Sequence, residues 1–95
     1  MSVTRINEFR AKDGQSQRVG DFLTSVVSAI EASEGCSSCR LLQNLGDERS
    51  FVVIELWDNV EAHKASTKDI PSEQLEEIMQ LLASPPQGRY FAEIV

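Results

Sequence analysis

The sequence has little of what binds nucleic acid or crosses a membrane. Its 9 Lys and Arg residues are scattered among 15 Asp and Glu residues, giving a formal net charge of −6 and a pI near 4.6. Phosphate recognition depends on clustered basic side chains, so we expect no nucleic-acid partner. No apolar run approaches the ~20 residues that span a bilayer, and the first ten residues, MSVTRINEFR, lack the apolar core of a signal peptide. We expect a cytoplasmic protein without membrane contact.

Histidine and cysteine are also scarce, which leaves few ligands for a metal or redox centre. Cys36 and Cys39 form a single C-x-x-C, and the one histidine, His63, lies far from them in the sequence. A structural zinc site needs four such ligands, and a thioredoxin-like pair stands at the start of a helix, which this segment does not predict. In a strand, residues three apart lie on opposite faces. We therefore expect two ordinary thiols and no metal.

Hydrophobic periodicity predicts the order β-α-β-β-α-β, with the second helical segment broken in two. The clearest element is a helix over 15–33, whose apolar residues recur every three or four positions, with Ser16 as N-cap and Gly35 in the left-handed conformation after it. The predicted strands cover 3–11, 39–45, 50–57 and 88–95, and the other helices cover 60–68 and the segment from Pro71 to Pro85.

This order predicts an α+β fold of the ferredoxin-like type, with a four-stranded antiparallel sheet and all helices on one face. At 95 residues and 41% hydrophobic content, the chain suffices for a single domain over 1–95. The strand FVVIELW is nearly all apolar, so we expect it at the centre of the sheet and covered on both faces. No other segment is available to cover the second face, which predicts a homodimer through the sheet faces.

The apolar strand contains one carboxylate, Glu55, which needs a partner if it is covered. Arg5 and Arg40 on the neighbouring strands are the expected ion-pair partners. Trp57 ends the same strand, where it either packs in the core or lines a pocket. His63 follows in a predicted helix and is either a hydrogen-bonded core histidine or a proton acceptor with a pKa near neutrality.

Several short segments occur together in this order of elements. They are Gly35-Cys36 before the second strand, Glu55-Leu56-Trp57 at the end of the third, Glu61-Ala62-His63 with Ser66 in the next helix, and Pro85-Pro86 before the last strand. With these segments, almost the whole chain resembles the antibiotic biosynthesis monooxygenase family, whose members form dimeric α+β barrels.

The resemblance implies oxygenation of a quinol or of a phenolic or polycyclic aromatic compound. Several members need no metal or flavin, because the electron-rich substrate anion itself reduces molecular oxygen, the co-substrate. On this basis the expected site residues are Trp57 and His63, with Asn7 of the first strand as a further candidate that is otherwise a solvent-facing strand residue. No cofactor is expected.

Two positions depart from the family's branches. Members that oxidise polycyclic antibiotic precursors have asparagine and tyrosine where this chain has Val53 and His63. The haem-degrading branch shares Asn7, but Ser66 stands where its tryptophan would fall and no histidine follows His63, so haem binding is not expected. The alternative function is a non-enzymatic dimeric module that binds a small hydrophobic ligand, because a fold alone does not decide activity.

Overall fold

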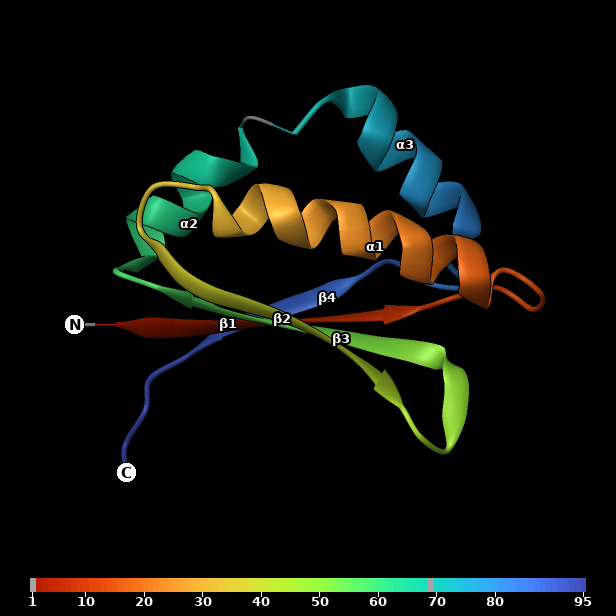
Figure 1. Cartoon of the computed structure of the whole chain (residues 1–95), viewed down its shortest axis with the longest axis horizontal. Helices are drawn as coiled ribbons and strands as arrows, with labels where there is room; N and C mark the ends of the chain where they lie inside the picture. The colour runs from red at the N-terminus through yellow and green to blue at the C-terminus, as the bar shows by residue number, and fades with distance from the viewer. Residues whose placement is uncertain (1, 69) are drawn as a thin grey trace.

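The computed structural model describes residues 2–68 and 70–95 and confirms the predicted β-α-β-β-α-β order (Figure 1). The elements are β1 (Val3–Arg10), α1 (Ser16–Glu31), β2 (Cys36–Asn44), β3 (Asp47–Trp57), α2 (Val60–Thr67), α3 (Ser72–Leu81) and β4 (Gln87–Phe91). The β2–β3 hairpin is longer than predicted because its strands run almost to the turn. The last strand is shorter, since β4 ends at Phe91 and not at Val95.

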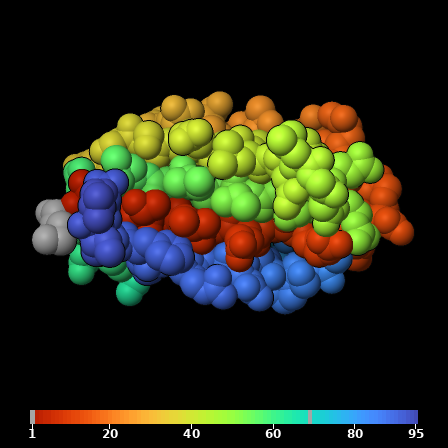
Figure 2. Space-filling model, turned by 90° about the horizontal axis from the view of Figure 1, so that it is seen from below, coloured from red at the N-terminus to blue at the C-terminus, as the bar shows by residue number. Residues whose placement is uncertain are grey.

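The sheet is antiparallel, with strand order β2-β3-β1-β4, so β3 is central as predicted. All three helices lie over one face of this sheet (Figure 1). Figure 2 shows the other face, where the four strands lie side by side with no helix in front of them. The fold is therefore the predicted ferredoxin-like α+β arrangement, and β3 is covered on one face by its own chain and not on both.

Strand alternation divides the side chains between these two faces. Phe51, Val53, Glu55 and Trp57 of β3 point toward the helices and are buried. Phe51 and Val53 belong to one hydrophobic cluster with the inner residues of α1 and α3. The buried hydrophobic cluster comprises Ala11, Val19, Leu23, Cys39, Phe51, Val53, Ile78, Leu81 and Leu82. The core therefore fills the layer between helices and sheet.

Of the two predictions for the ends of helix α1, one is wrong and one is confirmed. The predicted N-cap Ser16 is wrong, because the cap position is Gln15 and its side chain makes no capping hydrogen bond. The prediction for Gly35 is confirmed, with φ of +86°. A Cβ there would lie 2.7 Å from the Cβ of Ala62, so glycine lets the α1–β2 turn pack directly against α2. The Gly35 carbonyl also accepts from the Asp58 N–H at 2.8 Å.

The start of α2 decides where the histidine points. The Asn59 side chain accepts a hydrogen bond from the Ala62 N–H at 2.8 Å and caps the helix. From this start, His63 is the buried residue of α2. None of the helices in the described ranges is long and apolar enough to cross a bilayer.

In the sequence, Leu75, Ile78, Met79 and Leu82 are spaced as a single helical stripe, and this prediction is only partly correct. Ile78 and Leu82 are buried as expected, but Leu75 and Met79 are 47% and 44% exposed. Leu82 lies after the helix, where it forms a bridge with Ala11 beyond β1. α3 therefore covers the sheet mainly through its C-terminal turn.

Candidate functional site

A buried carboxylate on the central strand organises the polar residues of the helix-facing side. Glu55 is 2% exposed. One of its oxygens accepts from Nδ2 of Asn7 at 2.8 Å, and the other accepts from Nε1 of Trp57 at 2.8 Å. Both residues predicted for the site on β1 and β3 therefore contact Glu55.

The predicted arginine partners of Glu55 are wrong. Arg40 is in register with Ile54 and so lies on the opposite face of the sheet. Arg5 is in register with Glu55 on β1, but its Nε donates to Oδ1 of Asn7 at 3.1 Å. Asn7 thus lies between the Arg5 guanidinium and the Glu55 carboxylate and is hydrogen-bonded to both.

His63 reaches this group from helix α2. Its side chain is buried, with Nε2 4.0 Å from the Oε1 of Glu55 and Nδ1 2.6 Å from the hydroxyl oxygen of Tyr90 on β4. The imidazole meets the rings of Trp57 and Tyr90 edge-on, with centroids 5.4 Å and 5.3 Å away. We call the six residues Arg5, Asn7, Glu55, Trp57, His63 and Tyr90 the Glu55 cluster.

The outer side of the cluster is formed by Arg5 and Tyr90, which are half-buried. The Arg5 guanidinium carbon lies 4.6 Å from the centroid of the Tyr90 ring, within the range of a cation–π contact. Gly88 is the residue of β4 in register with Asn7. A Cβ at Gly88 would overlap the guanidinium of Arg5 and the side-chain oxygen of Asn7, so only glycine leaves room for them.

Burial shifts both titratable groups at the centre of the cluster toward their neutral forms. Desolvation raises the pKa of Glu55, against the lowering effects of Trp57, Arg5 and Asn7. Desolvation lowers the pKa of His63, and the positive charges of Arg5 and Lys64 lower it further. An ionised Glu55 carboxylate 4.0 Å away would raise the pKa of His63, but the lowering by burial is the larger effect. His63 is therefore a neutral imidazole near neutral pH and can accept a proton.

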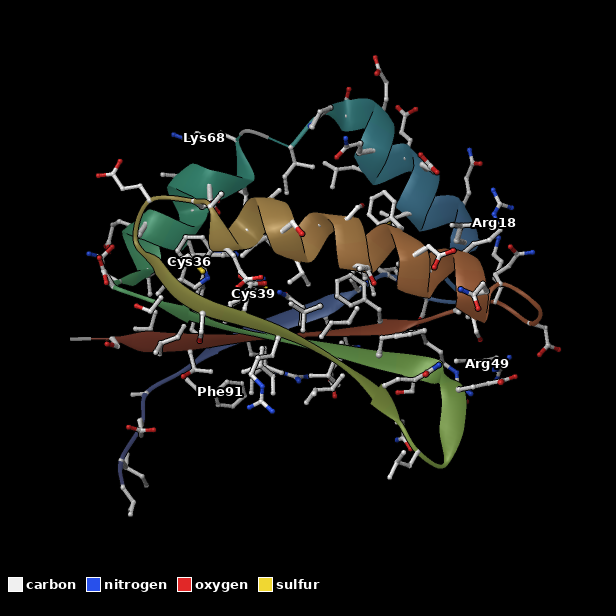
Figure 3. All side chains as sticks on the ribbon, in the orientation of Figure 1. Arg18, Cys36, Cys39, Arg49, Lys68 and Phe91 are labelled. Carbon is white, nitrogen blue, oxygen red and sulfur yellow. The ribbon has the colours of Figure 1, made fainter. Side chains whose placement is uncertain are left out.

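The two cysteines lie closer to the cluster than their spacing predicts. A β-bulge between Cys36 and Ser38 puts Cys36 in register with Trp57 and Cys39 in register with Glu55, so both thiols lie on the helix side (Figure 3). The expectation of opposite faces is wrong for this reason. Both are free, and burial together with the Glu55 charge raises the pKa of Cys39 to about 12, as expected for an unreactive thiol.

Two cavities lie apart from the Glu55 cluster. A half-open cavity of about 660 Å³ lies between α1 and the β2–β3 hairpin, beside Gln17, Asp21, Gln43 and Phe51. Another of about 430 Å³ lies between α1 and α3 beside Arg18, labelled in Figure 3. Within residues 2–68 and 70–95, no three His, Cys, Asp or Glu side chains are grouped to hold a metal ion.

The structure thus places the three candidate site residues, Asn7, Trp57 and His63, around Glu55. The lone carboxylate in an apolar strand was the available signal for Glu55. For Tyr90 there was none, because a tyrosine in a terminal strand is ordinary. Glu55 and Tyr90 therefore enter the candidate site only once the structure is known.

A family model matches the sequence, and solved structures share the fold. The family model for antibiotic biosynthesis monooxygenases matches residues 2–70. The fold is similar to Rv0793 of Mycobacterium tuberculosis, with a TM-score of 0.87, 18% identity, and coverage of 100% of this chain and 97% of that one.

Two further solved structures show the same fold. SnoaB, a cofactor-independent oxygenase of Streptomyces nogalater, has a TM-score of 0.81, 16% identity and coverage of 97% and 92% of the two chains. A protein of Nitrosomonas europaea has a TM-score of 0.90, 14% identity and coverage of 98% and 90%. No curated relative matches the sequence.

Proposed function

Since the chain belongs to the antibiotic biosynthesis monooxygenase family, we propose that it is a cofactor-independent monooxygenase acting on a quinol or related phenolic aromatic. SnoaB, which shares the fold, is a cofactor-independent oxygenase. The observation that carries the proposal is the neutral, buried His63 held between Glu55 and Tyr90. It is a base placed where it can activate a phenolic hydroxyl.

The reaction needs no external reductant. Removal of the proton from the substrate hydroxyl gives an electron-rich anion, which supplies electrons to molecular oxygen. One oxygen atom enters the substrate and the other leaves as water. With an anthrone, a CH₂ group and O₂ become C=O and H₂O; with a hydroquinone, the quinol and O₂ become a hydroxyquinone and H₂O. The role of the protein is then to remove the proton and to keep water away from the anion.

Each predicted site residue has a separate part in this scheme. His63 accepts the proton. Trp57 packs edge-on against the imidazole and ties its indole N–H to Glu55. Asn7 holds the other oxygen of Glu55 and links it to Arg5, whose charge favours an anion nearby.

We also propose that the protein acts as a homodimer through the open sheet face. The outward residues of β3 are Val52, Ile54 and Leu56, and Leu42 and Phe91 add exposed apolar surface to the same face. Such a face on a small domain calls for a partner.

The two borders of this face favour a second copy of the chain as that partner. The β2–β3 hairpin and the C-terminal segment both project to the open side of the sheet (Figure 1). Each ends in apolar side chains that are almost fully exposed, Leu45 in the hairpin and Ile94 and Val95 in the tail. Together they flank the open face at its two ends, and an identical sheet would cover this face by two-fold symmetry.

Oxygen uptake by the purified, metal-free protein with a panel of hydroquinones and anthrones tests the activity. We expect uptake above the spontaneous autoxidation rate, and a fall of about 100-fold or more in His63→Ala, the usual contribution of a general base. Thr67→Ala is the matched control, because Thr67 is an exposed residue of the same helix. Equal uptake by His63→Ala and wild type would remove His63 as base. No uptake with any compound would favour the non-enzymatic ligand-binding module.

A further inference from the structure

Three groups of the Glu55 cluster form a line from the core to the surface. The Glu55 carboxylate is at the buried end, His63 is in the middle, and Tyr90 is at the outer end. The two ring nitrogens of His63 face different partners, Nε2 toward Glu55 and Nδ1 toward the Tyr90 hydroxyl. The imidazole is thus placed to accept a proton at Nδ1 from the hydroxyl side while Nε2 faces the carboxylate.

The partners decide which nitrogen of the neutral imidazole carries the hydrogen. The Glu55 carboxylate accepts from the Trp57 indole and the Asn7 amide, and its Oε1 lies 4.0 Å from Nε2, too far for a hydrogen bond. Its negative charge still favours hydrogen on the ring nitrogen that faces it, Nε2, so Nδ1 is left with a lone pair. The 2.6 Å contact is in that case a hydrogen bond donated by the Tyr90 hydroxyl to Nδ1.

We infer that Tyr90 is the residue that meets the substrate hydroxyl, and that His63 and Glu55 form the relay behind it; this inference rests on the proposed oxygenase function. Of the three groups, Tyr90 alone is half-buried, whereas His63 and Glu55 are 8% and 2% exposed. A phenol that approaches from outside therefore reaches the tyrosine oxygen before the imidazole.

The proton step balances within these groups. The substrate O–H bond breaks and its proton forms a bond to the Tyr90 oxygen, while the Tyr90 proton passes to Nδ1 of His63. The products are a substrate anion, a neutral Tyr90 and an imidazolium whose Nε2–H faces the Glu55 carboxylate. Arg5, which lies over the Tyr90 ring, places a fixed positive charge beside the new anion.

In this arrangement Glu55 is a positioning residue. It does not touch the substrate, but it sets the tautomer of His63 and stabilises the imidazolium. Trp57 and Asn7 in turn fix the carboxylate, each with a hydrogen bond of 2.8 Å. This explains why the polar side chains on the helix face of β1 and β3 converge on one acid.

The tautomer is directly measurable because His63 is the only histidine in the chain. Nitrogen NMR of the ¹⁵N-labelled protein above pH 7 should show one protonated ring nitrogen, Nε2, and one acceptor nitrogen, Nδ1. In Tyr90→Phe, which keeps the ring and loses the hydroxyl, the Nδ1 signal should move, while Ser25→Ala, a remote hydroxyl deletion, should leave it unchanged. A wild-type spectrum with hydrogen on Nδ1 would overturn the relay.

Turnover of phenols of graded acidity tests the contact with substrate. For phenols that are protonated at the assay pH, Tyr90→Phe should lower kcat by about ten-fold or more. For phenols already ionised, kcat should be almost unchanged. An equal loss for both groups would overturn the role of Tyr90. If the wild type consumes no oxygen with any phenol, the proposed oxygenase function fails, and the ring-nitrogen signals still decide the relay.

Discussion

Replacement of Glu55 by glutamine removes the buried charge and keeps the shape of the side chain. The amide oxygen can accept from only one of the two donors, the Trp57 indole or the Asn7 amide, and its NH₂ group then faces the other. A buried donor without an acceptor costs about 1–3 kcal/mol. Rotation of the Asn7 amide would move the conflict to Arg5, which is half-buried and can shift, so we expect the lower part of this range.

The difference in stability between the wild type and Glu55→Gln should also depend on pH. Burial raises the pKa of Glu55 in the folded protein above its ordinary value of 4.5. The contribution of Glu55 to folding stability is therefore complete below pH 4.5, where the side chain is protonated, and is lost as the pH rises through the folded-state pKa. Glu55→Gln has no such loss. The wild type should therefore be more stable than the variant at pH 4, and this advantage should shrink or reverse by pH 8.

Denaturant unfolding at several pH values measures the difference, with the fluorescence of Trp57, the only tryptophan, as the signal. The protein concentration is held constant because self-association would contribute to stability. Glu61→Gln, an exposed charge on α2, is the control and should change stability by less than about 0.5 kcal/mol. An advantage of the wild type that grows from pH 4 to pH 8 would refute a carboxylate dominated by burial.

Three further predictions concern the histidine, the glycine and the open face. Burial lowers the pKa of His63 in the folded protein, so the stability that the neutral imidazole contributes is lost as the pH falls below 6.5 and through the folded-state pKa. NMR titration of His63 should give a midpoint below pH 6.5. Between pH 7 and pH 5, the melting temperature of His63→Gln should fall by less than that of the wild type. Gly88→Ala should destabilise the fold by about 1–3 kcal/mol and abolish oxygen uptake, because the methyl group displaces Arg5 and Asn7; unchanged uptake would contradict this. Ile54→Lys, on the open face, should convert a dimeric mass in light scattering to a monomeric one, and a wild type that is already monomeric would contradict the homodimer.

The sequence predicted the fold well because its periodic segments are long and their apolar residues are consistent. The helix around Val19 and Leu23 and the strand FVVIELW each have one dominant pattern, and each lies where that pattern requires. The errors in the predicted fold concern local features of the strands. A bulge after Cys36 reversed the face of the following residues, and the end of β4 lacks a neighbour for residues beyond Phe91.

The site was predictable only in part, because its connections are long-range. Asn7, Trp57 and His63 were candidates from a family resemblance, and the structure places all three around Glu55. Contact with Tyr90 depends on β4 lying beside β1, and the preference for Asn7 over an arginine partner depends on side-chain geometry. Neither can be read from the spacing of residues.

We propose that this protein inserts oxygen from O₂ into a phenolic or quinol-like compound without a cofactor. Incubation of metal-free and flavin-free protein with an anthrone or hydroquinone under ¹⁸O₂, followed by mass spectrometry of the product, tests it most directly. We expect one ¹⁸O atom per product molecule, with labelled product formed faster than in the protein-free control and its enzymatic formation lost in His63→Ala. Product without ¹⁸O, or labelling at the same rate with and without protein, would contradict it.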